Sequence, residues 1–239
     1  MVRSLNGQKA LIVGATGGMG LASALALSRE GVQCGLIGRD ESRTVAAAET
    51  CTKAGTAAIP IICNIGRIDD LEDMARQAIS KLGGLNYLVN CAGVHINARA
   101  HEADLASWDE KLNINFRAIY HLARHTLPEI NKNPGGAIIN IGSITSAYSG
   151  AGLHLAVKRA LSGYAEALFE DVREYGTKVC TIHPGYVNTS MARSDRLDPE
   201  KMIQPEDIAQ TILFVLGMPS TACPTEITIR PQYSPYRPS

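Results

Sequence analysis

Residues 9–31, KALIVGATGGMGLASALALSREG, contain the strongest local pattern in the chain. Residues 9–13 are typical of a short buried strand, and the run after the glycines has the apolar spacing of a helix that ends near Gly31. The glycines between them allow positive φ and a close approach of the backbone to a ligand. Because free N–H groups at the start of a helix attract phosphate, this order of elements predicts a phosphate-binding turn. The alternative is a tight turn that binds nothing.

The segment after this unit bears on the choice of ligand. Residues 32–37, VQCGLI, predict a second strand, followed by Gly38, Arg39 and Asp40. In a dinucleotide-binding unit an acidic side chain at the end of this strand binds the ribose hydroxyls, and here Gly38 stands about there. The guanidinium of Arg39 matches the geometry of a 2′-phosphate, which favours NADP(H) and leaves NAD(H) open. Asp40 either pairs with Arg39 or caps the next helix.

Strand-like and helical segments alternate along the rest of the chain. This alternation predicts one α/β domain over residues 1–239, with a seven-stranded parallel sheet and helices on both faces. The further strands are expected at 57–63, 85–89, 137–141, 179–182 and 225–230, and the further helices at 41–54, 68–81, 105–129, 152–175 and 204–216. Residues 231–239, PQYSPYRPS, are expected to form an extended tail.

The composition excludes several classes of partner. The 23 basic and 23 acidic residues cancel, so nothing indicates a nucleic acid or an anionic membrane surface. No apolar run has the length that spans a bilayer. The six cysteines are scattered without a CxxC pair or a metal-like spacing, so we expect no metal site and a reducing, cytoplasmic environment.

Polar and small residues follow the predicted strands where a ligand would bind. Ligands of parallel sheets bind at the carboxyl ends of the strands, where Asn64-Ile65, Asn90–Gly93 and Ser143 are expected. His154 and Lys158 lie four positions apart on one helix face, so with Ser143 they form a candidate proton-handling site. The loop 183–189 follows the sixth strand, and the polar segment 190–202 is a candidate lid.

The predicted helix over 105–129 contains two asparagines, Asn113 and Asn115. Asparagine is a poor residue for a helix interior, so its presence twice calls for a reason. A water or a main-chain contact inside a kinked helix is one explanation, and exposure to solvent is the other.

Together these motifs resemble the short-chain dehydrogenase/reductase family over nearly the whole chain. The family's TGxxxGxG turn matches Gly14, Gly18 and Gly20, with Val13 in place of its threonine. Its NNAG motif matches residues 90–93, and its PG…T loop matches residues 184–189. The resemblance implies a Rossmann-like doubly wound fold and two sets of site residues. The catalytic set is Asn115, Ser143, His154 and Lys158. The cofactor-binding set is Gly14, Thr16, Gly18, Met19, Gly20, Arg39, Asn64, Ile65, Asn90, Ala92, Gly93, Lys158, Pro184, Gly185, Val187 and Thr189.

One position departs from the family pattern. The YxxxK motif places tyrosine four residues before the lysine, and this chain has His154 there. Tyr148 lies in the preceding loop and Tyr164 lies beyond the lysine, so neither is an obvious substitute. By resemblance, the tyrosine donates a proton to a substrate carbonyl while a nicotinamide delivers hydride. An imidazolium has a reference pKa of ~6.5 against ~10 for a phenol. The positive charge of Lys158 would lower the pKa of His154 further. We therefore expect a slow carbonyl reductase, or one that favours acidic pH.

The substitution leaves three interpretations open. In the first, the protein is an NADP(H)-dependent oxidoreductase that interconverts a carbonyl and an alcohol of a small organic substrate through His154. In the second, it has a non-redox activity as an isomerase or lyase, or it senses the cofactor without catalysis. In the third, histidine silences an otherwise ordinary reductase. The resemblance also implies a homodimer or homotetramer that assembles through the helices at 105–129 and 152–175.

Overall fold

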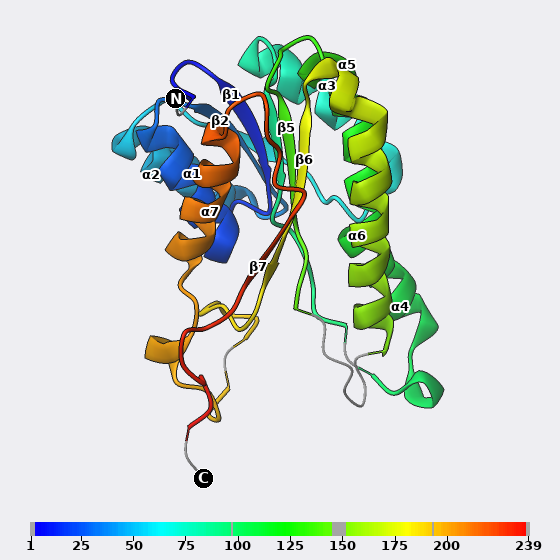
Figure 1. The fold of residues 1–239 in the computed structure, drawn as a ribbon. Helices are drawn as coiled ribbons and strands as arrows, with labels where there is room; N and C mark the ends of the chain where they lie inside the picture. Colours follow the sequence, from blue (N-terminus) through cyan, green and yellow to red (C-terminus); the bar gives the residue numbers. More distant parts are fainter. Residues whose placement is uncertain (1–2, 97, 145–151, 193, 238–239) are drawn as a thin grey trace.

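Seven parallel strands form a single sheet in the order β3-β2-β1-β4-β5-β6-β7, which confirms the predicted fold class (Figure 1). The computed structural model describes residues 3–96, 98–144, 152–192 and 194–237. The strands are β1 (Lys9–Val13), β2 (Gln33–Gly38), β3 (Ile59–Ile62), β4 (Tyr87–Asn90), β5 (Ala137–Ile141), β6 (Lys178–Pro184) and β7 (Glu226–Ile229).

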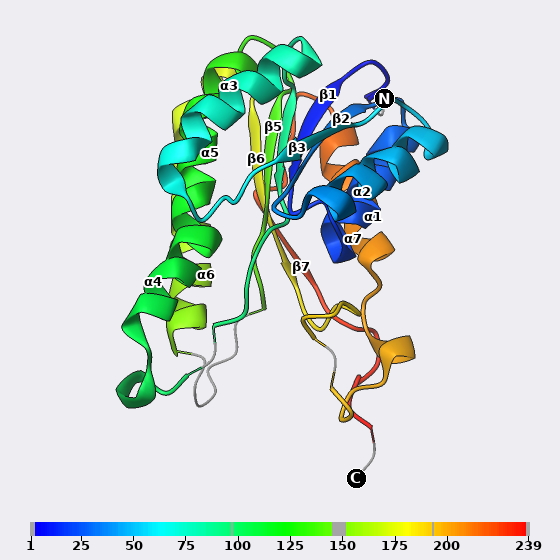
Figure 2. The ribbon, with the colours of Figure 1, turned by 180° about the vertical axis from the view of Figure 1, so that it is seen from behind.

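Helices cover both faces of the sheet. Those on one face are α1 (Gly18–Arg29), α2 (Glu41–Ala54) and α7 (Pro205–Gly217), as Figure 2 shows from behind. The opposite face carries α3 (Leu71–Leu82), α5 (Ala118–Ile130) and α6 (Gly152–Val172), and α4 (Leu105–Leu112) lies beside the first half of α6. Short 3₁₀ turns cover Ile68–Asp70, Ala100–Glu102, Arg173–Tyr175 and Pro199–Lys201.

Alternation along β1 explains why the sheet has two cores. Ala10 and Ile12 belong to the core under α1, α2 and α7, whereas Leu11 and Val13 belong to the core under α3, α5 and α6. Successive side chains of a strand point to opposite faces, and all four of these are almost fully buried. A strand apolar on both faces is typical of a sheet sandwiched between helices, which is why KALIV has no polar alternation.

The order of the strands reverses between β1 and β4, and this opens a crevice at their carboxyl ends. Gly14 follows β1 and Ala92 follows β4, and the two backbones nearly touch there. A Cβ on Gly14 would lie 2.7 Å from the Ala92 Cα, and Gly14 has φ +80°. Both facts require glycine at this turn.

Several predicted boundaries were wrong. The helix expected over 105–129 is interrupted by a π-helical turn, Asn113–Arg117, between α4 and α5. His183 and Pro184 belong to β6 rather than to the loop after it, because they pair with Thr228 and Ile229 of β7. Smaller shifts affect β2, which extends through Gly38, and β3, which is shorter than expected.

The cysteines and helices show no sign of a metal or membrane role among the described residues. All six cysteines are free thiols. Within the described ranges, no group of three or more His, Cys, Asp or Glu side chains is placed to bind a metal ion. Among the same residues no helix combines the length and apolarity needed to cross a membrane.

Candidate active site

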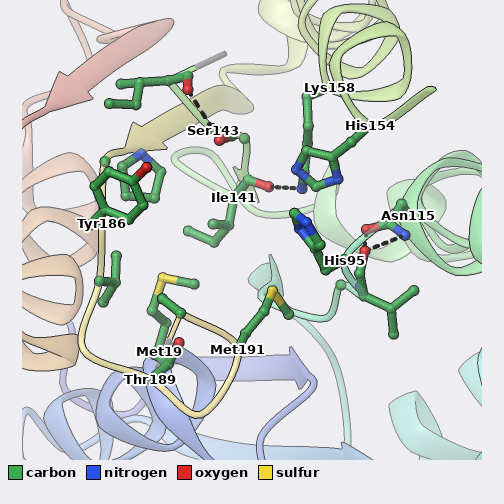
Figure 3. Close-up of a pocket in the computed structure, with 18 of the residues that line it drawn as sticks. Met19, His95, Asn115, Ile141, Ser143, His154, Lys158, Tyr186, Thr189 and Met191 are labelled. Atoms are coloured by element: carbon green, nitrogen blue, oxygen red, sulfur yellow. Dashed lines mark hydrogen bonds between the residues drawn. The ribbon is translucent and has the colours of Figure 1, made fainter. Parts of the chain in front are cut away.

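A cavity of about 590 Å³ lies at the carboxyl ends of β4, β5 and β6 (Figure 3). The segments that follow these strands form its walls, together with the start of α6 and the π-helical turn. Its lining residues include Met19, Cys91, Ala92, Gly93, Val94, His95, Asn115, Ile141, Ser143, His154, Lys158, Pro184, Gly185, Tyr186, Val187, Thr189, Met191 and Tyr236. The cavity therefore joins the end of the glycine-rich turn to the candidate proton-handling residues.

Lys158 is a buried cation that the main chain holds in place. Its side chain is 7% exposed, and its Nζ donates a hydrogen bond to the carbonyl oxygen of Ile141 at 2.9 Å. Burial lowers the pKa of Lys158 to about 8, because a low-dielectric interior disfavours its charged form. The residue thus brings a positive charge to the end of β5 beside Ser143.

Ser143 is positioned through its own backbone. Its carbonyl oxygen accepts a hydrogen bond from Nδ1 of His183 at 3.2 Å, and the other ring nitrogen of His183 lies 3.3 Å from the Glu226 carboxylate. These contacts tie the segment after β5 to β6 and β7. Among the described residues, the Ser143 hydroxyl makes a single long contact, 3.5 Å to the Ile144 carbonyl, so it can reorient toward a molecule in the cavity.

His154 stands on the first turn of α6 and contacts a second imidazole. Its ring centroid lies 5.2 Å from that of His95, and the two rings are tilted by 45°. Burial, then the charge of Lys158, then His95 lower the pKa of His154 to about 4. The expected direction is confirmed, but burial outweighs Lys158 as its cause. Near neutral pH this imidazole is uncharged.

Asn115 ties the π-helical turn to the segment after β4. Its Oδ1 accepts from the Val94 N–H at 3.2 Å, and its Nδ2 donates to the carbonyl oxygens of Val94 at 3.1 Å and Lys111 at 2.8 Å. The residue is 1% exposed, so the main-chain explanation holds for it and exposure to solvent does not. A π-helical turn adds one residue to a helix, and it frequently marks a functional site.

The match to known proteins agrees with this geometry. A family model described as short chain dehydrogenase matches residues 8–200. The chain belongs to the short-chain dehydrogenase family. Among curated relatives, an uncharacterized oxidoreductase of Staphylococcus epidermidis is 29% identical over 229 residues, which is 93% of this chain and 96% of the relative.

Solved members of the short-chain dehydrogenase family have the same fold. A short-chain dehydrogenase/reductase from Serratia marcescens has a TM-score of 0.89 at 26% identity, over 96% of this chain and 98% of the other. A dehydrogenase/reductase from Sinorhizobium meliloti has a TM-score of 0.87 at 30% identity, over 95% and 96%. A short chain dehydrogenase from Burkholderia cenocepacia, solved in complex with NADP, has a TM-score of 0.88 at 26% identity, over 95% and 98%.

The residues expected from the short-chain dehydrogenase pattern divide into two groups. Those that line the cavity are Met19, Ala92, Gly93, Asn115, Ser143, His154, Lys158, Pro184, Gly185, Val187 and Thr189. Those that lie outside its wall are Gly14, Thr16, Gly18, Gly20, Arg39, Asn64, Ile65 and Asn90. Asn90 is also withdrawn into the sheet, because it is 2% exposed and its Nδ2 donates to Asn140. Tyr148 lies outside the described residues.

Tyr164 does not lie in the cavity of this short-chain dehydrogenase. Its ring packs against Phe116 and Tyr120, with centroids 6.3 Å apart in both pairs. Burial, with a smaller contribution from Asp171, raises the pKa of Tyr164 to about 12. The Tyr164 phenol is thus absent from the wall of the cavity that Lys158 lines.

Sequence reasoning missed four residues at the site. His95 carries a local signal, because it follows the Asn90–Gly93 motif by two positions. Arg43 donates from Nη2 to the Thr16 carbonyl at 3.1 Å, which brings a guanidinium to the glycine-rich turn. Tyr186 and Tyr236 complete the set and join their hydroxyls at 2.7 Å. No local pattern points to Tyr236, which is 50 residues away from its partner.

The tail carries Tyr236 back to the cavity. The Asp198 N–H donates to the Pro235 carbonyl at 2.8 Å, and the Arg237 N–H donates to the Arg196 carbonyl at 2.9 Å. Leu197 and Tyr236 form an antiparallel bridge between these bonds. The expected tail and the candidate lid at 190–202 therefore contact each other, and Tyr236 forms part of the outer wall of the cavity.

Proposed function

We propose that this protein is an NADP(H)-dependent oxidoreductase that interconverts a carbonyl and an alcohol of a small organic substrate. His154 occupies the position of the family's tyrosine. The observation that carries the proposal is the cavity that Ser143, His154 and Lys158 share with Met19 of the glycine-rich turn. A nicotinamide in that cavity would lie beside a hydroxyl, an imidazole and a buried ammonium. In this proposal the protein acts in the cytoplasm.

The residues of the glycine-rich turn fit a nicotinamide dinucleotide. Helix α1 begins at Gly18 with no side-chain cap and no acidic residue in its first turn, so its first N–H groups suit a phosphate. The loop after β6 faces the glycine-rich turn, because a Cβ on Gly18 would lie 3.1 Å from the Thr189 side chain. When bound, the cofactor supplies a hydride to the carbonyl carbon.

Three side chains after β2 favour NADP(H) over NAD(H). Arg39 is exposed at the end of the strand, and Arg43 lies against the turn. Asp40 caps α2 by accepting from the Arg43 N–H and the Ser42 hydroxyl at 2.9 Å each, so its carboxylate is already engaged. A guanidinium after β2 and another at the turn suit a 2′-phosphate, since charge-assisted hydrogen bonds are stronger than neutral ones. The Burkholderia cenocepacia relative, solved with NADP, is consistent with this preference.

Cofactor preference is tested by replacing the arginines one at a time. We expect Arg39→Ala and Arg43→Ala each to raise KM for NADPH by about tenfold, because each removes one charge-assisted bond of about 1.5–3 kcal/mol. KM for NADH should stay within about twofold. Lys53→Ala, at the far end of α2, is the matched control. A wild-type protein that prefers NADH would contradict the assignment.

In the proposed reaction the chain's residues have separate tasks. Ser143 donates its hydroxyl to the carbonyl oxygen of the substrate. Lys158 fixes a positive charge at the end of β5 and, with burial, keeps His154 neutral. Asn115 holds Val94, which lines the cavity after β4. His154 donates an N–H toward the developing alkoxide, and as a neutral imidazole it is a weaker acid than an imidazolium.

The experiment that tests the function is His154→Tyr, assayed by NADPH oxidation with a panel of ketones and aldehydes. Turnover by the wild type that falls in His154→Tyr supports the reductase with histidine as donor. A large gain in the variant identifies histidine as the change that silences an ordinary reductase. NADPH binding without turnover by either protein contradicts the redox proposal and favours a sensor. Ser143→Ala is the control, because turnover that depends on this cavity should fall when the Ser143 hydroxyl is removed.

We also propose a homodimer or homotetramer that assembles through α4, α5 and α6. Leu105 at the start of α4 is 68% exposed, and Tyr175 after α6 is 57% exposed. Exposed large apolar side chains at both ends of one helical layer are consistent with a contact surface. Light scattering on the eluting peak of a sizing column gives the mass directly, and a monomer would contradict this part of the proposal.

A further inference from the structure

We infer that His95 returns a proton to His154 during turnover, so that the two imidazoles act as one proton-transfer pair between solvent and substrate. The inference rests on the proposed function, because it concerns the proton that reduction of a carbonyl consumes. It assigns a task to a residue that follows β4 and stands outside the family's catalytic set described above.

The geometry of the pair carries the inference. The two ring centroids are 5.2 Å apart, and Figure 3 shows the rings as neighbours beside the Lys158 ammonium. His95 is exposed, whereas His154 is only partly exposed. At this separation and tilt, a small rotation of one ring or a single water connects a nitrogen of each. His95 therefore links the interior imidazole to solvent.

A buried nitrogen of His154 is a second observation in favour of the proton-transfer pair. Its Nδ1 is buried and finds no hydrogen-bond partner in the part of the chain that the structure describes. A buried polar atom without a partner costs about 1–3 kcal/mol, so such atoms are usually satisfied in the working state. The neighbouring imidazole is a donor of the right kind, directly or through water.

The chemistry of a neutral imidazole requires a second proton. When the carbonyl carbon accepts a hydride from NADPH, its oxygen takes the N–H proton of one His154 nitrogen. His154 would be left as an imidazolate, which is a very unfavourable anion, unless its other nitrogen receives a proton at the same time. His95 gives that proton and takes another from solvent. His154 is then neutral before and after the step, and the alcohol has gained one hydride and one proton.

The other ionisable groups of the cavity are worse placed for this task. Lys158 is buried, and its ammonium donates to the Ile141 carbonyl. Burial raises the pKa of the Cys91 thiol to about 12, so it holds its proton. The phenols of Tyr186 and Tyr236 are bonded to each other, and Figure 3 shows Tyr186 on the opposite side of the cavity from His154.

The test compares His95→Gln and His95→Ala with His101→Gln, an exposed histidine of the neighbouring 3₁₀ turn that serves as the control. We expect His95→Gln to lower kcat by about ten- to a hundredfold with little change in KM, and to make the rate fall more steeply as pH rises. Added imidazole should restore His95→Ala toward the wild-type rate. His101→Gln should behave as the wild type.

A measurement without cofactor or substrate accompanies the kinetics. Histidine resonances of the free protein, followed by NMR against pH, report the titration of His154. Because His95 contributes to the lowered pKa of His154, removing it should move that titration upward. The shift reports that the two imidazoles interact, whereas rescue of His95→Ala by imidazole separates proton transfer from a merely structural role.

The outcomes separate the two proposals. A wild type that reduces carbonyls, with an unchanged kcat, pH profile and His154 titration in His95→Gln, overturns the proton-transfer pair and leaves the proposed function standing. A rise in KM alone also overturns it, since that identifies His95 as a substrate contact. A wild type that binds NADPH but reduces no carbonyl overturns the proposed function and this inference with it.

Discussion

At the scale of single residues, His154 is where burial and charge meet. Burial disfavours its imidazolium, and Lys158 adds a like charge on the same helix face. In the unfolded chain the same side chain would titrate near its reference pKa of ~6.5. The free energy of unfolding is therefore smaller in acid, because the unfolded chain binds a proton at His154 that the native protein does not bind.

This difference predicts an acid-sensitive fold. Between about pH 6.5 and 4 the unfolded chain binds more protons at this site than the native protein, so the free energy of unfolding should fall as pH falls. The expected loss from His154 is about 1–3 kcal/mol over this window. Thermal unfolding of wild type and His154→Gln at a series of pH values measures it. The variant should lose less stability in acid, and His101→Gln should follow the wild type. Equal losses in all three would contradict the prediction.

At the scale of elements, the turn from β1 into α1 is held by close contact of two backbones. The left-handed conformation of Gly14 and its approach to Ala92 leave no room for a side chain. Gly163, within α6, is the opposite case, because a Cβ there would meet nothing within 4 Å. Gly14 thus has no room for a side chain, whereas Gly163 has room for one.

The two substitutions to alanine should therefore change stability in opposite directions. Gly14→Ala combines strain at positive φ with a clash against main-chain atoms, so we expect a loss of about 2 kcal/mol or more together with weaker NADPH binding. Gly163→Ala should stabilise α6 by about 0.5–1 kcal/mol, because alanine loses less backbone entropy in a helix. Midpoints of urea unfolding and NADPH fluorescence titrations report both effects. A tolerated Gly14→Ala would show that the turn is looser than its contacts indicate.

The elements differ in how well the sequence could predict them. β1, its turn and α1 follow from patterns within 23 residues, and the alternation of apolar segments then implies the parallel sheet. The π-helical turn at Asn113–Arg117 was not predicted, because the two asparagines that mark the place were equally compatible with a kink and with exposure to solvent. The same holds at the site. Ser143 and Lys158 end up in the cavity as expected, whereas Tyr236 reaches it only through long-range bonds to residues 196–198.

At the scale of the whole molecule, segments far apart in sequence close the cavity from outside. Tyr186, which follows β6, stacks edge-on against Tyr236 with centroids 5.7 Å apart, and their hydroxyls lie 2.7 Å apart. Both rings remain partly open to solvent, at 39% and 54%. The outer wall is thus a hydrogen-bonded pair of tyrosines that buries little surface. It contributes little to the core that stabilises the sheet.

Opening this wall should affect substrate binding more than folding. We expect Tyr236→Ala to raise KM for the substrate by about three- to tenfold with a small change in kcat, since a binding contact is lost while the reacting groups stay in place. Tyr233→Ala, at a tyrosine of the same tail that is 71% exposed, should leave both constants unchanged. Steady-state kinetics with unfolding curves for both variants provide the measurement. A loss of kcat equal in size to the loss of kcat/KM would contradict a role confined to binding.

The position of this wall in the chain has a consequence for biosynthesis. Translation delivers the glycine-rich turn before Ser143, His154 and Lys158, and it delivers Tyr236 after all of them. A nascent chain that has exposed β1 through β6 already holds every side chain proposed for proton transfer. We therefore expect cofactor affinity to arise on the ribosome before the cavity can discriminate among substrates.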